Sequence, residues 1–293
     1  MFLKAKTHCP LCDSNKISPK YHISRYTLKF NTDICEDCGF IFMNPQFKDD
    51  VIKNFYSEDY FKGRADYSYI DERDIKKYSG YVWDKRIKII HKYIDSGNFL
   101  DVGCSFAGLL ESAAKFYTPF GIEISDYAFS HATKMFSKNI HHGTLYDHKF
   151  KHNSFSVITM IELIEHLADP VYAISQCFDL LAKNGLLVIQ TANMNGKQAK
   201  DLGENYEYFM PGHLSYFTAE NLSSLLKRTG FEKIKVYYPV EFGLLPKLLK
   251  SRGSFKKISD YKSWLRIISY HIKSKIHFRN FAMTSSMVIY AEK

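Results

Sequence analysis

The chain has 293 residues, of which 45% are apolar and 24% are charged, with 15 glycines and 8 prolines. This composition is typical of a globular protein of one large or two small domains, and it excludes disordered, collagen-like and coiled-coil classes. The 40 basic and 31 acidic residues give a formal charge of +9, which favours an anionic partner without identifying it.

Two features of the chain bear on its location. The longest stretch without Asp, Glu, Lys or Arg is residues 184–196, and its 13 residues fall short of the ~20 that a transmembrane helix requires. The first residues, MFLKAKTHCPLC, have a lysine-broken start and lack the apolar core of a secretory signal. We therefore expect a cytoplasmic protein.

Residues 1–46 contain two CxxC pairs separated by 22 residues. Each CxxC turn offers two thiolates to one tetrahedral ion, and a reducing cytosol disfavours disulfide bonds between them. The spacing predicts a small zinc-binding lobe whose four ligands are Cys9, Cys12, Cys35 and Cys38. Four thiolates leave no open position on the metal, so we expect a structural Zn²⁺ site. Reduced free thiols or a redox pair are the alternatives.

Residues 47–97 form a predicted helical linker between this lobe and the rest of the chain. Ile87, Ile90 and Ile94 recur at three- and four-residue spacing, as on one face of a helix. The aromatic stretch FYSEDYF, which contains Tyr60, precedes them. These aromatic residues are candidates for a lid that keeps water from a cofactor, and ordinary packing between the two domains is the alternative.

From residue 98 to the end, strand-like apolar runs alternate with helical patterns. The strand-like runs FLDVG, FGIEI, SVITMI and LLVIQT are each followed by a helical pattern. This alternation predicts repeated βα units, and therefore a parallel sheet that is covered on both faces. Gly185 and Gly230 are predicted helix stops before strands.

The first strand of this region ends in an acid and opens through small residues into a helix. A side chain at Gly103 would block the approach of a ligand to the backbone, and the helix start presents free N–H groups. Glu123, twenty residues later, ends the next strand and is placed to accept hydrogen bonds from two ribose hydroxyls. The pattern indicates a nucleoside-containing cofactor, although dinucleotide enzymes and tight turns without a ligand share it.

The chain resembles the class I S-adenosylmethionine-dependent methyltransferases, in particular a branch with an N-terminal zinc-binding region found among sugar and polysaccharide methyltransferases. The stretches that carry the resemblance are CPLC, CEDCGFIFMNP, NFYSEDYF, LDVGCSFAGLL, FGIEIS, IELIEHLADP, NGLLVIQTANMNG and GHLSYFTAENLSSLLKRTGF. It implies a Rossmann-like, doubly wound, mostly parallel sheet. It also implies S-adenosylmethionine as the cofactor, and a cofactor site made of Tyr60, Asp101, Gly103, Ser105, Glu123, Ile124, Leu145 and Ile161.

Within this resemblance, two positions of the glycine loop differ from the family pattern, because Ser105 and Ala107 stand where glycine is usual. Both side chains are small. The negative charge of Asp101 would repel a dinucleotide pyrophosphate and attract a sulfonium cation. Leu145 and Tyr146 are expected to flank the adenine, with Asp147 as the acid near it.

Methyl transfer is an in-line displacement, so the enzyme mainly aligns the nucleophile, the methyl carbon and the sulfur. A general base would assist a hydroxyl acceptor, and histidine has a suitable pKa. His213, on a loop before a helix capped by Thr218 and Asn221, is the preferred base. His166 and Glu165, at the carboxyl edge of the sheet, are the next candidates. Either histidine could instead have only a local structural role.

The predicted acceptor is a saccharide, either a nucleotide sugar or a glycan precursor, and O-methylation is preferred over C-methylation. An RNA methyltransferase whose basic residues grip phosphates is one alternative. A non-catalytic binding protein with a vestigial methyltransferase fold is another.

A basic insertion is predicted at residues 243–281 within the methyltransferase domain. Residues 244–280 contain ten basic residues and one acid, and their apolar residues recur at helical spacing. Such a segment suits peripheral contact with the inner face of an anionic membrane. A structural cover, or a clamp for saccharide or RNA phosphates, would explain the same pattern.

Overall fold

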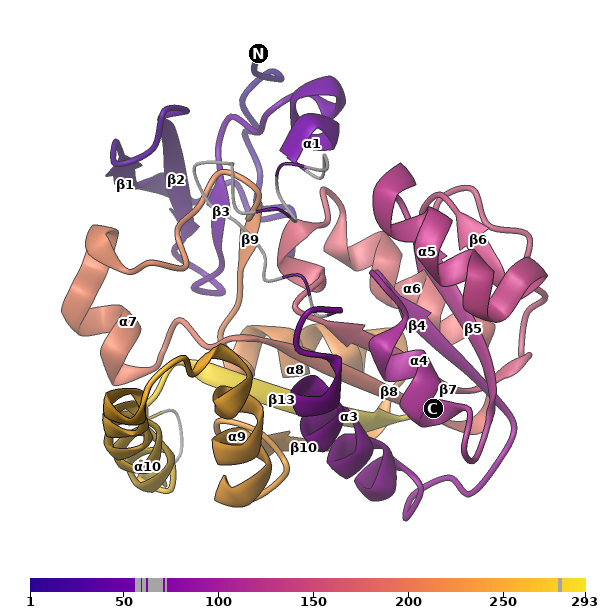
Figure 1. Ribbon diagram of the computed structural model, residues 1–293. Coiled ribbons are helices and arrows are strands. Elements are labelled where there is room, and N and C mark those ends of the chain that lie inside the picture. The colour runs from indigo at the N-terminus through magenta and orange to yellow at the C-terminus, as the bar shows by residue number, and fades with distance from the viewer. Residues whose placement is uncertain (56–58, 60–61, 63–70, 72, 279–280) are drawn as a thin grey trace.

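The computed structural model describes residues 1–55, 59, 62, 71, 73–278 and 281–293 (Figure 1). Tyr60, one of the predicted cofactor residues, lies outside these residues. The main sheet has seven strands in the order β10-β13-β8-β7-β4-β5-β6. Strands β4 to β8 pair in parallel, and β13 is antiparallel to both of its neighbours. The predicted Rossmann-like, mostly parallel sheet is therefore confirmed.

The strands of this sheet are β4 (Asn98–Val102), β5 (Thr118–Glu123), β6 (Ile140–His142), β7 (Phe155–Ile161), β8 (Leu181–Ala192), β10 (Glu232–Tyr237) and β13 (Ser286–Glu292). The helices that accompany them are α3 (Lys76–Ile90), α4 (Gly108–Ala113), α5 (Asp126–Phe136), α6 (Pro170–Leu180) and α8 (Ala219–Thr229). Short 3-10 helices occur at η1 (Ser137–Asn139), η2 (Ile164–His166), η3 (Gly203–Asn205), η4 (Arg252–Ser254) and η5 (Ile258–Lys262).

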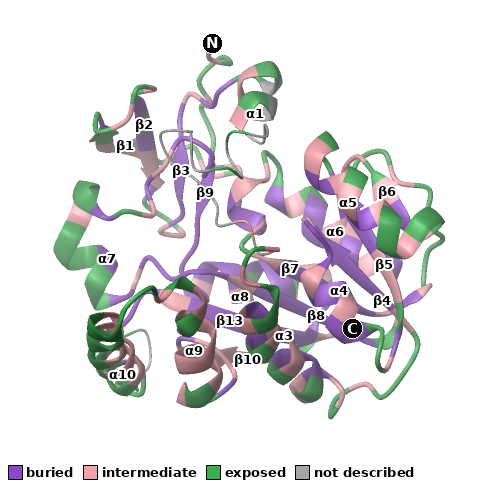
Figure 2. Cartoon of the chain, in the orientation of Figure 1, coloured by how far each residue is buried: buried purple, intermediate pink, exposed green. Residues whose placement is uncertain are grey.

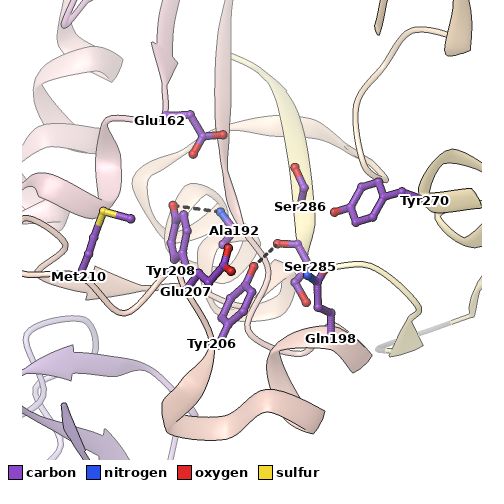
Figure 3. A pocket seen from close by; sticks show the side chains of 10 residues that line it. All are labelled: Glu162, Ala192, Gln198, Tyr206, Glu207, Tyr208, Met210, Tyr270, Ser285 and Ser286. Atoms are coloured by element: carbon purple, nitrogen blue, oxygen red, sulfur yellow. Dashed lines mark hydrogen bonds between the residues drawn. The ribbon is translucent and has the colours of Figure 1, made fainter. Parts of the chain in front are cut away.

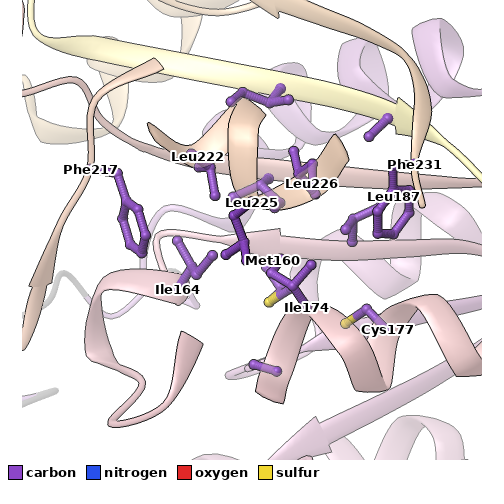
Figure 4. Close-up of a cluster of buried hydrophobic side chains, with 14 of the residues drawn as sticks. Met160, Ile164, Ile174, Cys177, Leu187, Phe217, Leu222, Leu225, Leu226 and Phe231 are labelled. Atoms are coloured by element: carbon purple, nitrogen blue, oxygen red, sulfur yellow. The ribbon is translucent and has the colours of Figure 1, made fainter. Parts of the chain in front are cut away.

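Successive residues of each strand face opposite sides of the sheet, so the core has two layers. Leu100 and Ile158 pack in one buried cluster with residues of α6 and α8 (Figure 4). Their neighbours Phe99 and Val157 pack in a second cluster with residues of α3 and α4. Helices therefore cover both faces, as the uninterrupted apolar strands predicted.

The predicted capping residues and helix stops mark the ends of these elements, with one exception. Thr218 and Asn221 form the predicted capping box at the start of α8, and Gly230 ends that helix with a φ of 112°. The predicted helix stop at Gly185 is wrong. Helix α6 already ends at Leu180, and Gly185 lies inside β8, where Asn184 takes the left-handed conformation and the register against β7 shifts.

A second sheet joins the N-terminal segment to a distant part of the chain. Its strands are β1 (Ile17–Ile23), β2 (Phe30–Cys35), β3 (Ile41–Met43) and β9 (Ser215–Tyr216), in that order. β9 pairs with β3 although more than 170 residues separate them. Helices α1 (Asp49–Phe55) and α7 (Lys197–Leu202) lie beside this sheet in Figure 1.

The segment between β10 and β13 folds into α9 (Leu244–Ser251), α10 (Ser263–Lys273) and the short strands β11 (His277–Phe278) and β12 (Phe281–Ala282). Figure 1 shows α9 beside α3 and α10 outside α9. Trp264 of α10 donates a hydrogen bond from Nε1 to Ser251 Oγ of α9, over 3.0 Å. The insertion is thus built as a two-helix layer.

A fully buried ion pair holds α3 to the start of this insertion. Arg86 of α3 donates from Nε to Glu241 Oε1 and from Nη2 to Gln190 Oε1 of β8. The side chains of Arg86 and Glu241 are 1% and 0% exposed. Because two buried charges neutralise each other here, removing either one leaves the other without compensation.

We expect Glu241→Ala to lower the free energy of unfolding by roughly 3–5 kcal/mol, the usual cost of breaking a buried pair. Urea denaturation followed by circular dichroism measures it. Lys233→Ala is the matched control, because it breaks an ion pair with Glu292 whose lysine is 73% exposed. Equal losses in the two variants would contradict the assignment.

Candidate active site

Two acids that were predicted to bind the cofactor lie at the carboxyl ends of neighbouring parallel strands, on one edge of the sheet. Asp101 of β4 is 5% exposed and accepts a hydrogen bond at Oδ1 from Thr159 Oγ1 of β7, over 2.6 Å. Glu123 ends the neighbouring strand β5 and is 7% exposed. Ligands bind at this edge in open α/β sheets.

Glu123 holds the backbone of the loop in place. Its Oε2 accepts from the N–H of Ser105 over 2.7 Å, and its Oε1 accepts from the N–H of Ser125 over 2.8 Å. Burial raises the pKa of this carboxyl group, and the two backbone donors oppose the rise. The carboxylate therefore fixes the turn after β4.

The loop after β4 has the backbone of a glycine-rich turn. Gly103, Ser105 and Ala107 have φ values of 75°, 48° and 63°. For the last two, this left-handed conformation costs about 1–3 kcal/mol each, and such strain is concentrated at ligand sites. A Cβ at Gly103 would lie 2.9 Å from Leu163 Cδ1. Ser105 Oγ is buried and has no hydrogen-bond partner among the residues that the structure describes, so it is available to a ligand.

The other residues predicted to bind the cofactor are placed around this edge. Leu145 is buried, Ile161 ends β7 and is half-buried, and Ile124 is 39% exposed just after Glu123. Tyr146 stacks on Tyr172, with ring centroids 5.0 Å apart.

The acid predicted near the adenine has partners within the protein. Asp147 Oδ1 lies 2.9 Å from His141 Nε2 and accepts a hydrogen bond from the N–H of Thr144 over 2.8 Å. These contacts shape the turn after β6.

The four predicted cysteine ligands converge. Cys9 Sγ lies 3.7 Å from Cys38 Sγ, and Cys12 Sγ lies 3.6 Å from Cys35 Sγ. All four sulfurs lie within 4.8 Å of one another. Zn–S bonds of ~2.3 Å in a tetrahedron place the sulfurs about 3.8 Å apart, so this cluster is compatible with a zinc ribbon. A hydrogen bond with Cys38 lowers the pKa of Cys9 to about 5.

Glu165 is a fully buried anchor for the loop that precedes β9. One carboxylate oxygen accepts a hydrogen bond from the Tyr208 hydroxyl, and the other accepts from Thr191 Oγ1 over 3.0 Å. Its main-chain carbonyl accepts from the N–H of Leu214 over 2.7 Å. Burial, followed by the charge of Glu162, raises the pKa of Glu165 well above its usual value.

The two candidate histidines pack against each other beside this anchor. Their ring centroids are 4.5 Å apart. Because each Nδ1 faces a backbone carbonyl, each donates its proton there, His166 to Gly212 and His213 to Tyr208, over 2.9 and 2.8 Å. Burial lowers the pKa of His166 to about 4 and that of His213 well below its usual value.

Glu165, His166 and His213 lie close enough to share a cation, because one ligand atom of each lies within 4.8 Å of the others. Protein groups already engage both Glu165 oxygens and the Nδ1 atom of each histidine. We therefore treat these side chains as positioning groups for the loop.

A cavity of about 320 Å³ opens beside this edge of the sheet (Figure 3). Its lining is rich in tyrosine, carboxylate and hydroxyl groups, from Glu162, Ala192, Gln198, Tyr206, Glu207, Tyr208, Met210, Tyr270, Ser285 and Ser286. Neither His166 nor His213 is in this lining, and His213 is only 5% exposed. That His213 is the base stays a prediction.

Glu162 is the functional candidate that the sequence analysis missed. It follows β7 directly and takes a left-handed φ of 52°. Gln190 Nε2 donates to Glu162 Oε1 over 2.6 Å, and Gln190 in turn accepts from the buried Arg86. The signal was present, because Glu162 is the first residue after a parallel strand. Tyr208 and Tyr270 carried no signal, because they come from distant segments.

Comparisons with known proteins agree with this geometry. A family model described as a methyltransferase domain matches residues 75–236, which is more than half of the chain. The ubiquinone biosynthesis O-methyltransferase of Neisseria meningitidis serogroup C is 28% identical over 168 residues, covering 48% of this chain and 71% of that relative. The enzyme of the same name from Psychrobacter cryohalolentis is 30% identical over 138 residues, covering 43% of this chain and 52% of that relative.

A solved structure resembles a larger part of the chain. It is a Haemonchus contortus phosphoethanolamine N-methyltransferase in complex with phosphomonomethylethanolamine and S-adenosylhomocysteine. The TM-score is 0.55 at 14% identity, over 93% of this chain and 70% of that one. This likeness concerns the fold.

We expect acid to destabilise the protein through His166. Its pKa is lowered on folding, so the unfolded chain takes up a proton below pH ~6.5 while the folded protein stays neutral until about pH 4. Stability is therefore lost as the pH falls through this window, by about 2 kcal/mol at pH 5 from this residue. Urea unfolding at pH 7 and pH 5 measures the loss.

His166→Gln should flatten this pH dependence, since glutamine does not titrate and keeps a hydrogen-bond donor. His152→Gln, at an exposed position, serves as the control. An unchanged slope in the His166 variant would show that other groups cause the acid sensitivity.

Proposed function

Because the chain belongs to the methyltransferase domain family and is a class I S-adenosylmethionine-dependent methyltransferase, we propose that it O-methylates a saccharide hydroxyl in the cavity bounded by Glu162, Tyr208 and Tyr270. The observation that carries the acceptor class is the lining of that cavity. Tyrosine rings offer flat apolar surfaces, and carboxylate, amide and hydroxyl groups bind several hydroxyls at once.

The loop after β4 fits S-adenosylmethionine. Its left-handed backbone supports contact with the methionine part, as does the buried Ser105 Oγ, which has no partner in the described part of the chain. The carboxylate of Asp101 suits the positive sulfonium. We place the ribose at Glu123, with Leu145 and Ile124 beside the adenine. When bound, the cofactor supplies an activated methyl group.

The residues of the chain then have to align the acceptor hydroxyl and accept its proton. In our proposal Glu162 does this, because it lines the cavity and Gln190 orients its carboxylate. Glu165, His166 and His213 are positioning residues that hold the loop carrying Tyr206 and Tyr208. A base contributes roughly 10²–10⁴-fold, and alignment contributes the larger part of the rate.

A phenolic hydroxyl is the second candidate acceptor. The relatives named ubiquinone biosynthesis O-methyltransferase favour it, and the tyrosines of the cavity would also stack on an aromatic ring. The two carboxylates of the cavity, Glu162 and Glu207, favour the acceptor with more hydroxyl groups.

The purified full chain should therefore be incubated with methyl-labelled cofactor and, separately, with sugar nucleotides, glycan extracts, catechols and total RNA. Label in a saccharide supports the proposal. Label only in catechols moves the acceptor to the phenolic class, and label only in RNA overturns the choice of a small acceptor.

We propose that the four cysteines bind one Zn²⁺ ion. Leu11, inside the first CxxC turn, is buried, and its carbonyl accepts a hydrogen bond from Arg228 of α8 over 2.7 Å. The metal would therefore stabilise the contact between the N-terminal sheet and the methyltransferase domain, with no role in the chemistry.

We expect one equivalent of zinc per chain purified without chelator, and a marked loss in Cys9→Ser, since the binding energy of the metal is also folding energy. Atomic emission and thermal melting measure the two effects. Cys177→Ser, at a buried cysteine outside the cluster, should keep its zinc. Well below one equivalent in the wild type would refute the site.

We expect Glu123→Gln to weaken binding of S-adenosylhomocysteine by roughly 1.5–3 kcal/mol, since a charged acceptor for two hydroxyls is lost. Calorimetry measures the affinity, and circular dichroism checks the fold. Asp201→Asn, at an exposed acid of α7 outside the proposed cofactor site, is the control. Unchanged affinity in the Glu123 variant would remove this residue from the site.

We expect Glu162→Gln to lower kcat by roughly 10²–10⁴-fold with little change in cofactor affinity, because a base acts in the transition state. His213→Ala should reduce turnover through the loop and weaken acceptor binding as well. The split between kcat and the acceptor KM separates the roles, because loss of a base changes kcat alone and loss of a positioning residue changes both. A fall in kcat at unchanged acceptor KM in His213→Ala, and not in Glu162→Gln, would make the histidine the base.

A further inference from the structure

The segment from residue 244 to 280 carries the whole net charge of the protein. It holds 10 of the 40 basic residues and 1 of the 31 acidic residues, so the rest of the chain has 30 of each and is neutral. Arg279 lies outside the described residues, and the structure places the rest of this charge on α9, α10 and the turns around them, at one corner of the molecule (Figure 1). The positive surface is therefore local.

The same segment, together with Phe281 just after it, exposes an unusual amount of apolar surface. Among the described residues, 17 large apolar side chains are exposed, and eight of them lie between residues 245 and 281. They are Leu245, Ile258, Tyr261, Leu265, Ile272, Ile276, Phe278 and Phe281. Exposed apolar side chains that gather in one place indicate an interaction surface.

On α10 the apolar and basic side chains form adjacent stripes. Leu265 and Ile272 are two turns apart and are 70% and 61% exposed. Arg266 directly follows Leu265, and Lys273 directly follows Ile272; both basic side chains are also exposed. Seven residues make almost two full turns, so each pair shares a face of the helix, and the basic stripe borders the apolar one.

The opposite side of α10 faces the protein. Tyr270 lines the cavity of the proposed active site, and Trp264 is bonded to α9. Lys250 of α9 in turn lies over the ring of Trp83 of α3, 5.2 Å from its centroid. Figure 2 shows exposed residues on α10 at the edge of the molecule. The exposed stripes are thus held on a fixed support.

We propose that the outer face of α10, with the η5 turn before it, docks on an anionic membrane surface. A bilayer interface accommodates apolar side chains and basic side chains on one helix face at the same time. A soluble polyanion would neutralise the charge but leave Leu265 and Ile272 in water. No helix in the described part of the chain is long and apolar enough to cross a membrane.

Docking in this orientation would bring the cavity close to the bilayer, because Tyr270 lies on the inner side of the docked helix. An acceptor carried by a lipid would then be presented at the cavity. The docking itself does not depend on the proposed acceptor, and it is tested without turnover.

Co-sedimentation of the full chain with vesicles tests the proposal. We expect binding to phosphatidylcholine vesicles that contain phosphatidylglycerol, no binding to phosphatidylcholine alone, and weaker binding in high salt. The triple variant K262E/R266E/K273E should lose on the order of 100-fold in affinity, since each basic residue contributes roughly fivefold. L265S/I272S should lose at least about tenfold at unchanged charge.

The control for the charge variant is K134E/K138E/K149E, at exposed lysines outside the segment, which should bind nearly as the wild type does. Leu202→Ser, at another exposed apolar residue, is the control for the apolar variant. Melting temperature and cofactor affinity show that each variant is folded.

Three results would overturn the proposal. They are equal binding to neutral vesicles, wild-type affinity of L265S/I272S together with displacement by RNA, and no binding to anionic vesicles at low salt. The second result would make the segment a site for soluble polyanions, and the third would make it a structural cover.

Discussion

The pairing of β9 with β3 is the contact on which the arrangement of the site depends. Two residue pairs, Ile41 with Tyr216 and Phe42 with Ser215, fasten a late segment of the methyltransferase domain to the N-terminal sheet. Such a short strand is not stable alone, so it relies on β2 and β3 and on the cysteine cluster beside them. The loop that carries Tyr206 and Tyr208 precedes β9 and is fixed by the same pairing. The N-terminal sheet therefore shapes the cavity without contributing a residue to its lining.

Hydrogen bonds of buried polar groups also hold the loop before β9 in place. Glu165 ties the Tyr208 loop to β8 through Thr191, and Arg86 ties β8 to Glu241 at the start of the insertion. Glu165, Thr191 and Arg86 are buried, so leaving one of their polar atoms without a partner would be costly. The network therefore favours a single arrangement of the loop. Glu162 takes its orientation from this network through Gln190. The Glu162 carboxylate lines the cavity, and the hydrogen bond from Gln190 fixes its orientation.

The sequence predicted the features that arise from local patterns. Alternating strands and helices gave the sheet, and CxxC spacing gave the cysteine cluster. Gly185 was misread, because a glycine between two apolar runs can mark a bulge as well as a helix stop. β9 could not be predicted, since two residues carry no periodicity and their partner is distant in sequence. The same holds for the cavity, whose walls come from the ends of β7 and β8, the loop before β9 and helix α10.

Helix α10 separates two electrostatic environments. Its inner side contributes Tyr270 to a cavity that contains Glu162 and Glu207, and its outer side carries Arg266 and Lys273. An anionic group is therefore attracted to the outer face and repelled from the cavity. In our proposal, the acceptor is therefore neutral and rich in hydroxyl groups at its reacting end, with any negative charge some distance away. A saccharide joined to a phosphate-bearing carrier has this distribution of charge, whereas RNA, charged along its whole length, does not.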